Sequence, residues 1–292
     1  MTHPGARLRE IMQNDMVVAP GCYDGITSKL IEAAGHHAAY MTGAGTSAAH
    51  GYPDFGLITM TEMVENARRI TRTIDIPLIC DADTGYGNEL NVTRTVQEYD
   101  RKGAAAIHLE DQGFPKKCGH LEDKEIISRE EYFAKIRAAA AARISPDFVI
   151  IARTDSRAVA GFDEAIARCN GAIAAGADVA FFEAPQTLEE VEKVPKLVNG
   201  PCLLNVVHKG KTPKVELADA KAMGYKMAIL PSILFRNILG TSEAILRELA
   251  TGKLPTPMGD MTPLEGFRKF GADEWDALRT AFRDTPKRDA AE

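Results

Sequence analysis

The chain contains eight short runs of apolar and β-branched residues, each of a length typical of a buried strand. Longer stretches between them carry apolar residues at three- and four-residue spacing, which predicts helices, several starting with Asn, Ser or Thr. The predicted strands are residues 16–19, 38–41, 77–80, 105–109, 148–152, 179–182, 202–204 and 226–230. The predicted helices are residues 59–73, 91–102, 128–143, 162–175, 187–198 and 213–223.

Glycines mark the expected ends of several helices. Gly35, Gly103, Gly176 and Gly224 stand where a left-handed C-cap would stop the helix. Eight strand–helix units in succession predict an α/β fold, the (β/α)8 or TIM barrel. The length of 292 residues fits a single domain, with the barrel at about 15–240 and a C-terminal helical extension at about 241–292.

Polar residues follow nearly every predicted strand, at the end of the barrel where catalytic groups of this fold stand. Taken alone, Asp24, Asp155 and Ser232 are equally well explained as helix caps or turn formers. The convergence of the whole set on one rim predicts an active site. Its members are Tyr23, Asp24, Thr42, Gly43, Ala44, Asp81, Asp83, Glu110, Asp111, Arg153, Asp155, Glu183, Asn205 and Ser232.

Residues 81–87, Asp-Ala-Asp-Thr-Gly-Tyr-Gly, place two carboxylates at a strand end, followed by glycines that allow a sharp turn. Oxygen ligands without histidine favour Mg²⁺ or Mn²⁺ over zinc, and Mg²⁺ usually keeps several waters. We therefore expect one direct ligand and one through water from Asp81 and Asp83, with Glu110 as a third acid. The alternative is a solvated acidic turn in which Asp83 leads into a helix.

Residues 115–120, Pro-Lys-Lys-Cys-Gly-His, surround a thiol with cations. Two ammonium groups and an imidazole would stabilise the thiolate of Cys118, which predicts acid/base chemistry. The alternative is a solvated loop whose cysteine is a small buried hydrophobe. Zinc at Cys118 and His120 is disfavoured, because this pair supplies too few ligands.

Composition narrows the possible partners. A net charge of −6 without basic clusters argues against nucleic acid, and no apolar run approaches the roughly 20 residues of a membrane span or forms a signal sequence. The five cysteines form neither a disulfide framework nor a CxxC zinc site, which predicts reduced thiols. We expect a cytosolic protein with a small-molecule ligand.

The motifs resemble those of the isocitrate lyase/phosphoenolpyruvate mutase superfamily over roughly residues 15–240. The resemblance implies a barrel whose last helices swap between subunits of a homotetramer built from dimers. It also implies a mobile gate at residues 113–125 that closes over the substrate. The motifs are residues 40–45 (Tyr-Met-Thr-Gly-Ala-Gly), 53–56 (Pro-Asp-Phe-Gly), 81–87, 109–112 (Leu-Glu-Asp-Gln), 116–120, 152–155 (Ala-Arg-Thr-Asp), 182–185 (Phe-Glu-Ala-Pro) and 205–213 (Asn-Val-Val-His-Lys-Gly-Lys-Thr-Pro).

The resemblance implies a role for each matched residue. Asp81 and Asp83 would hold Mg²⁺, or Mn²⁺, with Glu110 nearby through water and Asp54 as an acid beside the metal loop. Cys118 would protonate the departing carbanion, tuned by Lys116 and His120, and either Tyr40 or a metal-linked acid would take the substrate's hydroxyl proton. The residues expected to bind substrate are Thr42, Gly43, Ala44, Gly119, Arg153, Glu183, Asn205 and Arg236.

The implied reaction is retro-aldol cleavage of a 2-hydroxy di- or tricarboxylate into a 2-oxo acid and a carboxylate. The intact residues 116–120 favour carbon–carbon cleavage over the phosphonomutase chemistry of other members. His208, Lys209 and Gly210 replace the Glu-Phe-Gly turn typical of methylisocitrate lyases, and no arginine appears from residue 261 until Arg268. We therefore expect a 2-alkylmalate or 2,3-dimethylmalate lyase. The alternatives are methylisocitrate lyase, an oxaloacetate hydrolase or decarboxylase, a phosphonomutase-type member and a non-catalytic dicarboxylate binder.

Overall fold

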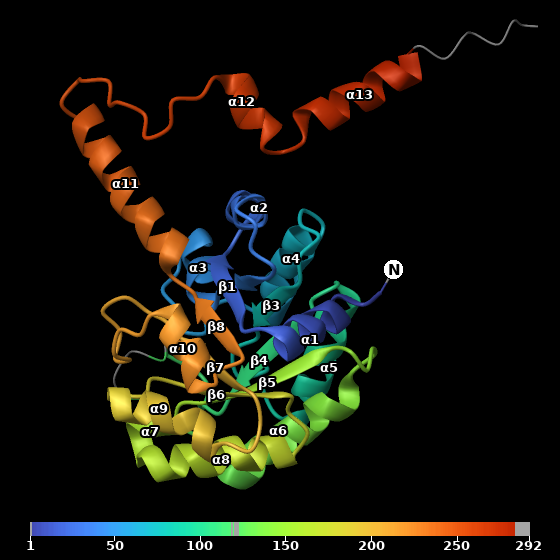
Figure 1. The fold of residues 1–292 in the computed structure, drawn as a ribbon, viewed down its shortest axis with the longest axis vertical. Helices are drawn as coiled ribbons and strands as arrows, with labels where there is room; N and C mark the ends of the chain where they lie inside the picture. Colours follow the sequence, from blue (N-terminus) through green and yellow to red (C-terminus); the bar gives the residue numbers. More distant parts are fainter. Residues whose placement is uncertain (1, 118, 120–122, 284–292) are drawn as a thin grey trace, which may run out of the picture. The chain divides into compact units, whose positions relative to one another are not determined.

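The computed structural model describes residues 2–117, 119 and 123–283. Eight parallel strands follow one another in sequence order and close into a barrel through the pairing of β1 with β8 (Figure 1). The predicted (β/α)8 fold is confirmed. The strands are β1 Val17–Cys22, β2 Ala39–Met41, β3 Leu78–Asp81, β4 Ala106–Glu110, β5 Val149–Thr154, β6 Val179–Phe182, β7 Cys202–Asn205 and β8 Met227–Leu230.

Several strands run further than the apolar pattern predicts. β3, β4 and β7 end on Asp81, Glu110 and Asn205, one residue beyond the last apolar position. The parallel pairing continues onto these polar residues, with Asp81 opposite His108 and Glu110 opposite Arg153. Hydropathy marks only the apolar part of a strand, whereas the hydrogen-bonded pairing carries the strand up to the rim.

Within residues 2–240, helices surround the strands (Figure 1). The glycines expected at helix ends are confirmed, since Gly35, Gly103, Gly176 and Gly224 have φ of 83°, 82°, 109° and 103°. The helices are α1 Pro4–Asn14, α2 Gly25–Ala33, α3 Gly43–Ala49, α4 Met60–Thr71, α5 Glu89–Arg101, α6 Arg129–Ala142, α7 Ser156–Ala160, α8 Phe162–Ala174, α9 Leu188–Leu197, α10 Leu217–Met223, α11 Ile233–Leu249, α12 Pro263–Arg268 and α13 Ala272–Arg283.

The structure differs from the predicted helices at α10 and α1, and it adds the short helices α3 and α7, which were not predicted. α10 begins at Leu217 and not at residue 213. Residues 213–216 are irregular chain, and Val215 among them is buried in the apolar cluster beneath α10. α1 was not predicted. His3 caps it and Pro4 begins it, and its Leu8 and Met12 pack into the apolar interior of the barrel. α1 therefore closes the end of the barrel opposite the rim.

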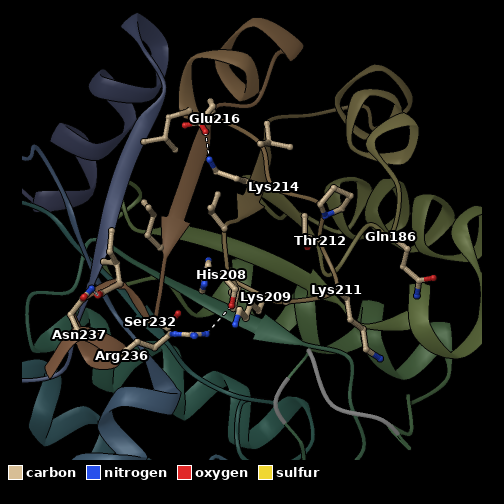
Figure 2. Close-up of a pocket in the computed structure, with 18 residues that line it drawn as sticks. Gln186, His208, Lys209, Lys211, Thr212, Lys214, Glu216, Ser232, Arg236 and Asn237 are labelled. Atoms are coloured by element: carbon tan, nitrogen blue, oxygen red, sulfur yellow. Dashed lines mark hydrogen bonds and ion pairs between the residues drawn. The ribbon is translucent and has the colours of Figure 1, made fainter. Parts of the chain in front are cut away.

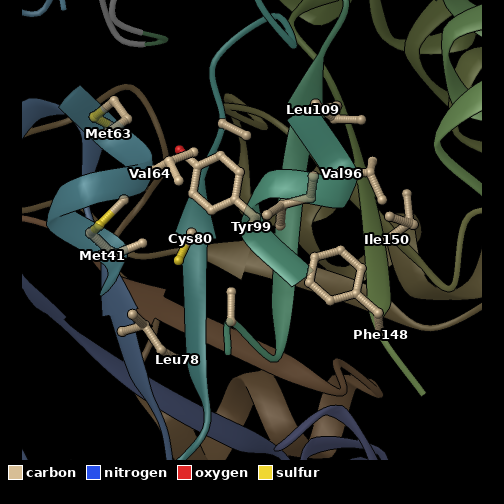
Figure 3. Close-up of a cluster of buried hydrophobic side chains, with 14 of the residues drawn as sticks. Met41, Met63, Val64, Leu78, Cys80, Val96, Tyr99, Leu109, Phe148 and Ile150 are labelled. Atoms are coloured by element: carbon tan, nitrogen blue, oxygen red, sulfur yellow. The ribbon is translucent and has the colours of Figure 1, made fainter. Parts of the chain in front are cut away.

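The two faces of each strand are both apolar, as expected when helices cover a parallel sheet. Ile79, Ile151 and Phe181 belong to the cluster inside the barrel. Leu78, Cys80 and Ile150 point the other way, into a cluster that the surrounding helices complete (Figure 3). This alternation decides which residues at the strand ends face the barrel mouth.

The chain divides into two compact units, Met1–Gly240 and Thr241–Glu292. The described part of the second unit holds the end of α11 together with α12 and α13. Large apolar side chains there are exposed, including Leu254 at 90%, Met258 at 83% and Phe282 at 79%. Among the described residues, no helix combines the length and apolar character needed to cross a membrane.

Candidate active site

Five predicted site residues share the inner face of five successive strands. Each stands two residues beyond a position that faces the barrel interior. Because side chains alternate between the two faces of a strand, each of these side chains also points inward, into the barrel mouth. Their exposure is between 1% and 7%, which shows that the rim is a buried polar layer above the apolar interior. These residues are Asp81, Glu110, Arg153, Glu183 and Asn205.

Asp81 accepts hydrogen bonds from its own turn and from the end of β2. Its Oδ1 accepts from Asp83 N at 3.0 Å and its Oδ2 from Gly43 N at 3.1 Å. A Cβ on Gly43 would overlap Oδ2, so glycine is required for this approach. Burial raises the pKa of Asp81, but the charges of His108, Lys116 and Arg153 outweigh burial and set it at about 2.

Asp83 is not a solvated helix-entry residue. It is 6% exposed, has a φ of 46°, and α5 starts only at Glu89. Its Oδ1 lies 2.7 Å from Lys116 Nζ, which also pairs with Asp54. Burial and then the charges of Asp81 and Asp54 raise the pKa of Asp83 to about 6, against the lowering effect of Lys116.

The oxygens of these acids fit a divalent cation. Glu110 Oε1 is buried and has no hydrogen-bond partner within the described ranges, while Asp83 Oδ1 and Glu110 Oε2 form ion pairs with Lys116 and Arg153. Glu110 Oε2 lies 3.2 Å from Arg153 Nη1 as an ion pair, and burial raises the pKa of Glu110 well above its usual range. Residues 2–117, 119 and 123–283 do not contain a ready cluster of three metal-ligating side chains. Lys116 supplies the positive charge between Asp54 and Asp83 in this structure.

Arg153 is fixed on both sides of its guanidinium. Its Nε and Nη2 donate to the two carboxylate oxygens of Asp155 at 2.8 and 3.1 Å. The guanidinium also lies over the ring of Phe181, 5.2 Å from its centroid. Asp155 makes no cap bond to α7, so its contact with Arg153 is the better explanation, whereas Asp24 does cap α2. The planar fork is thus held at the barrel mouth, as carboxylate recognition requires.

Part of the predicted gate contacts this rim. Gly119 is buried, and a Cβ there would overlap Arg153 Nη2 and Glu183 Oε1. Asn205 Nδ2 donates to the same Glu183 carboxylate at 3.2 and 3.3 Å. Cys118 and His120 lie outside the described residues, so their predicted roles stay predictions.

Two buried residues near the acids were not anticipated from sequence. His108 Nε2 lies 2.8 Å from the Tyr40 hydroxyl and 3.4 Å from Asp81 Oδ1. Burial lowers the pKa of His108 to about 4 and raises that of Tyr40 well above its usual range, which favours both neutral forms. The position of His108 two residues before Glu110 was the available signal. Lys124 is the second such residue, and its Nζ lies 2.7 Å from Asp155 Oδ1.

Arg236 lies apart from these charges, in a cavity of about 1050 Å³ beyond β7 and β8 (Figure 2). Its Nη1 donates to the carbonyl of His208 at 2.8 Å. Lys209 and Ser232 also line this cavity, which we call the basic pocket, as does Lys214, paired with Glu216 at 2.6 Å. Residues 206–217 therefore form one wall of a ligand-sized space, and they include His208, Lys209 and Gly210, on which the predicted choice of sub-family partly rests.

The phosphoenolpyruvate phosphomutase family model matches residues 8–250. The chain belongs to the phosphoenolpyruvate mutase/isocitrate lyase superfamily. The predicted family is thereby confirmed. Over 229 residues the chain is 48% identical to a 2,3-dimethylmalate lyase of Eubacterium barkeri, covering 78% of this chain and 79% of that protein. Over 250 residues it is 45% identical to a 2-methylisocitrate lyase of Aeropyrum pernix, covering 85% of this chain and 80% of the relative.

Solved structures of this superfamily share the fold. A crystal structure of 2,3-dimethylmalate lyase matches with a TM-score of 0.91 and 39% identity, over 100% of this chain and 99% of the other. A phosphonopyruvate hydrolase complex with oxalate and Mg²⁺ matches with a TM-score of 0.85 and 29% identity, over 97% and 100%. Both curated relatives are named lyases, the enzyme class predicted for this chain.

Proposed function

We propose that this protein is a divalent-metal-dependent carbon–carbon lyase that cleaves a 2-hydroxy dicarboxylate of the 2-alkylmalate or 2,3-dimethylmalate type. The observation that carries the proposal is a buried rim in which the acids Asp81, Asp83 and Glu110 face the fixed fork of Arg153. Similarity to the 2,3-dimethylmalate lyase supports this substrate class. The products are a 2-oxo acid and a carboxylate.

Asp81 and Asp83 are the residues we assign to the metal, with Glu110 contributing through water. Mg²⁺ is favoured because the donors are oxygens, and the related hydrolase structure contains this ion. A bound divalent cation lowers the pKa of a hydroxyl group next to it, which is the chemistry that it supplies here. Asp54 and Lys116 balance the charge beside this site.

The remaining rim residues bind and orient the substrate. Arg153 offers its planar fork to one carboxylate. In the segment Thr42–Ala44 the backbone N–H of Ala44 is the donor offered to the substrate, since Thr42 N donates to Cys22 O and Gly43 N to Asp81 Oδ2. Glu183 directly follows β6, Asn205 ends β7, and the two side chains are joined by a hydrogen bond. Gly119 approaches Arg153 and Glu183 so closely that it limits the space for substrate on that side.

The hydroxyl proton passes to Tyr40 or to one of the acids beside the metal. Its loss drives cleavage of the bond between C2 and C3, and the electron pair moves onto the departing fragment as an enediolate. Cys118 gives that carbon a proton and completes the carboxylate product. Tyr40 takes part through its hydroxyl, which donates to Asp81 Oδ2 at 3.4 Å. Closure of residues 113–125 excludes water, so that the carbanion meets only this donor.

A second candidate substrate is methylisocitrate, favoured by 45% identity to a methylisocitrate lyase and by the cations of the basic pocket. The deciding experiment incubates the protein with Mg²⁺ or Mn²⁺ and 2,3-dimethylmalate, 2-alkylmalates, methylisocitrate or oxaloacetate, and identifies each product. We expect a 2-oxo acid such as pyruvate from the alkylmalates, lost with excess EDTA. Absence of any cleaved product across this panel would refute the lyase assignment.

We also propose a homotetramer in which C-terminal helices are exchanged between subunits. The exposed apolar side chains of the second unit support it, because apolar surface of this kind is normally covered in an assembly. Light scattering after size-exclusion chromatography tests the stoichiometry. A monomer at micromolar concentration would contradict the proposal.

A further inference from the structure

Lys124 is a lysine whose side chain is only 1% exposed. A buried ammonium group is strongly unfavourable unless hydrogen-bond acceptors surround it. Lys124 Nζ has two acceptors, the carbonyl oxygen of Gly119 at 2.6 Å and Oδ1 of Asp155 at 2.7 Å. The first belongs to the segment between β4 and α6, and the second follows β5. One charge thus joins two separate parts of the rim.

Asp155 connects Lys124 to the substrate-binding arginine. It is fully buried, and its two oxygens also accept the Nε and Nη2 hydrogens of Arg153. Both cations therefore share one carboxylate, which sets the position of Arg153 relative to Lys124. Charge-assisted bonds of this length are short and directional, so the arrangement leaves little freedom at either cation.

Gly119 meets the same arginine from the other side. Its Cα is packed so tightly that a Cβ would overlap both Arg153 Nη2 and Glu183 Oε1. Its carbonyl is held by Lys124 while its Cα rests on Arg153. A closed chain of contacts therefore runs from Gly119 through Lys124 and Asp155 to Arg153 and back to Gly119.

We propose that Lys124 is a positioning residue that sets the Gly119 peptide against Arg153 by bridging the Gly119 carbonyl and Asp155. It acts through these two groups and makes no contact with the substrate. The inference rests on the proposed function, in which Arg153 binds the substrate and Gly119 limits the space for it. Because both neighbours act in ground-state binding, the loss of Lys124 affects KM more than kcat.

The test compares Lys124→Met with Lys221→Met. Methionine keeps a long apolar side chain and removes the ammonium. Lys221 is the control because its Nζ pairs with a carboxylate at the same distance, 2.7 Å from Asp15 Oδ1, but in an exposed position. We expect kcat/KM to fall roughly 100-fold in Lys124→Met, mainly through KM, and to stay within about threefold in Lys221→Met.

Binding of oxalate in the presence of Mg²⁺ gives a readout that does not require turnover. We expect calorimetry to show a Kd at least about tenfold weaker in Lys124→Met than in Lys221→Met. Lys124→Met combined with Asp155→Asn should be no worse than Asp155→Asn alone, because both changes break one chain of contacts. A merely structural lysine would give additive losses and an unchanged oxalate Kd in the folded fraction.

Equal kinetics and equal oxalate binding in the two methionine variants would overturn the inference while leaving the lyase assignment intact. A wild-type protein inactive on every hydroxy acid would overturn the lyase assignment, and the oxalate measurement would still decide the role of Lys124. If Lys124→Met does not fold, Lys124→Gln replaces it. The shorter glutamine amide can reach only one of the two acceptors, Gly119 O or Asp155 Oδ1. We therefore expect kcat/KM and oxalate affinity to fall in this variant as well.

Discussion

The strand ends from β3 to β6 carry charges that are almost fully buried, whereas the segments after β7 and β8 carry charges that face an open cavity. Glu110 and Glu183 are 1% exposed and Arg153 is 7% exposed. His208, Lys209 and Arg236 are exposed side chains around the basic pocket. The first region holds each charge in one place, and the second leaves room for ligands of different size. Under the proposed function, the first region carries the reaction chemistry and the second sets the choice of substrate.

The same difference orders the expected effects of substitution. Removing one member of a buried charge pair leaves the other unpaired, which is costly, whereas exposed charges are screened by water and salt. Changes in the β3–β6 region should therefore reduce activity by orders of magnitude. Changes in the basic pocket should shift substrate preference by small factors.

The largest effect is expected for Asp81→Ala. Removing a group that only orients a metal ligand typically lowers metal affinity or activity by about 10- to 100-fold. Loss of a ligand itself should therefore lower activity by more than about 1,000-fold. The fold should survive, because Asp81 stands at the rim above the apolar interior. Steady-state assays across Mg²⁺ concentrations, with circular dichroism as the folding control, measure this. Wild-type turnover by the variant, or by the native protein in EDTA, would refute the metal site.

Cys118→Ser is expected to come next. Serine keeps the size of the side chain, but its hydroxyl is too weakly acidic to protonate the carbanion, so kcat should fall by roughly 100- to 10,000-fold, as is typical of general acids. KM should change little. Cys22, Cys80, Cys169 and Cys202 are buried, and Cys169→Ser is the matched control. Near-normal turnover in Cys118→Ser would show that the thiol is not the proton donor.

Gly119→Ala tests whether the close packing of the rim matters for binding. The added methyl group would overlap Arg153 Nη2 and Glu183 Oε1. Arg153 cannot yield easily, because Asp155 holds its Nε and Nη2. We expect kcat/KM to fall by about 10- to 100-fold, or roughly 1.4 to 2.8 kcal/mol in transition-state stabilisation, with unchanged thermal stability. Gly113→Ala is the control, since a Cβ there meets only ordinary contacts.

The fold could be predicted because each strand and helix has its own local pattern. The positions of Asp81, Glu110 and Arg153 could be predicted because strand ends meet at one rim. The contact of His108 with Tyr40 joins residues 68 apart, and that of Lys124 with Asp155 joins residues 31 apart. No local pattern encodes such pairs. The predicted start of α10 at residue 213 was wrong. Thr212-Pro213 resembles a helix start, but Val215 is buried in irregular chain and the helix begins only after Glu216.

The substrate comparison probes the open region. A third carboxylate requires a cation, because a buried unpaired carboxylate costs several kcal/mol. Residues 261–267, the stretch in which the resemblance implies that cation, contain no arginine and include Pro263 and Leu264, apolar side chains suited to an alkyl group. We expect kcat/KM for 2,3-dimethylmalate or a 2-alkylmalate to exceed that for methylisocitrate by at least about tenfold, or roughly 1.4 kcal/mol. The opposite preference would assign the missing charge to Arg236, to Arg268 or to a partner subunit.

Arg236→Met should have the smallest effect. Arg236 is exposed and donates to the His208 carbonyl, so its loss removes a screened charge and one hydrogen bond at the edge of the basic pocket. We expect kcat/KM for the alkylmalates to fall by only about two- to fivefold, and that for methylisocitrate by about tenfold or more. Lys214→Met is the control, because Lys214 lines the same pocket but is paired with Glu216. If each variant lowered kcat/KM by the same factor for the alkylmalates and for methylisocitrate, the basic pocket would have no part in substrate choice. The contrast between the two regions of the rim would then fail.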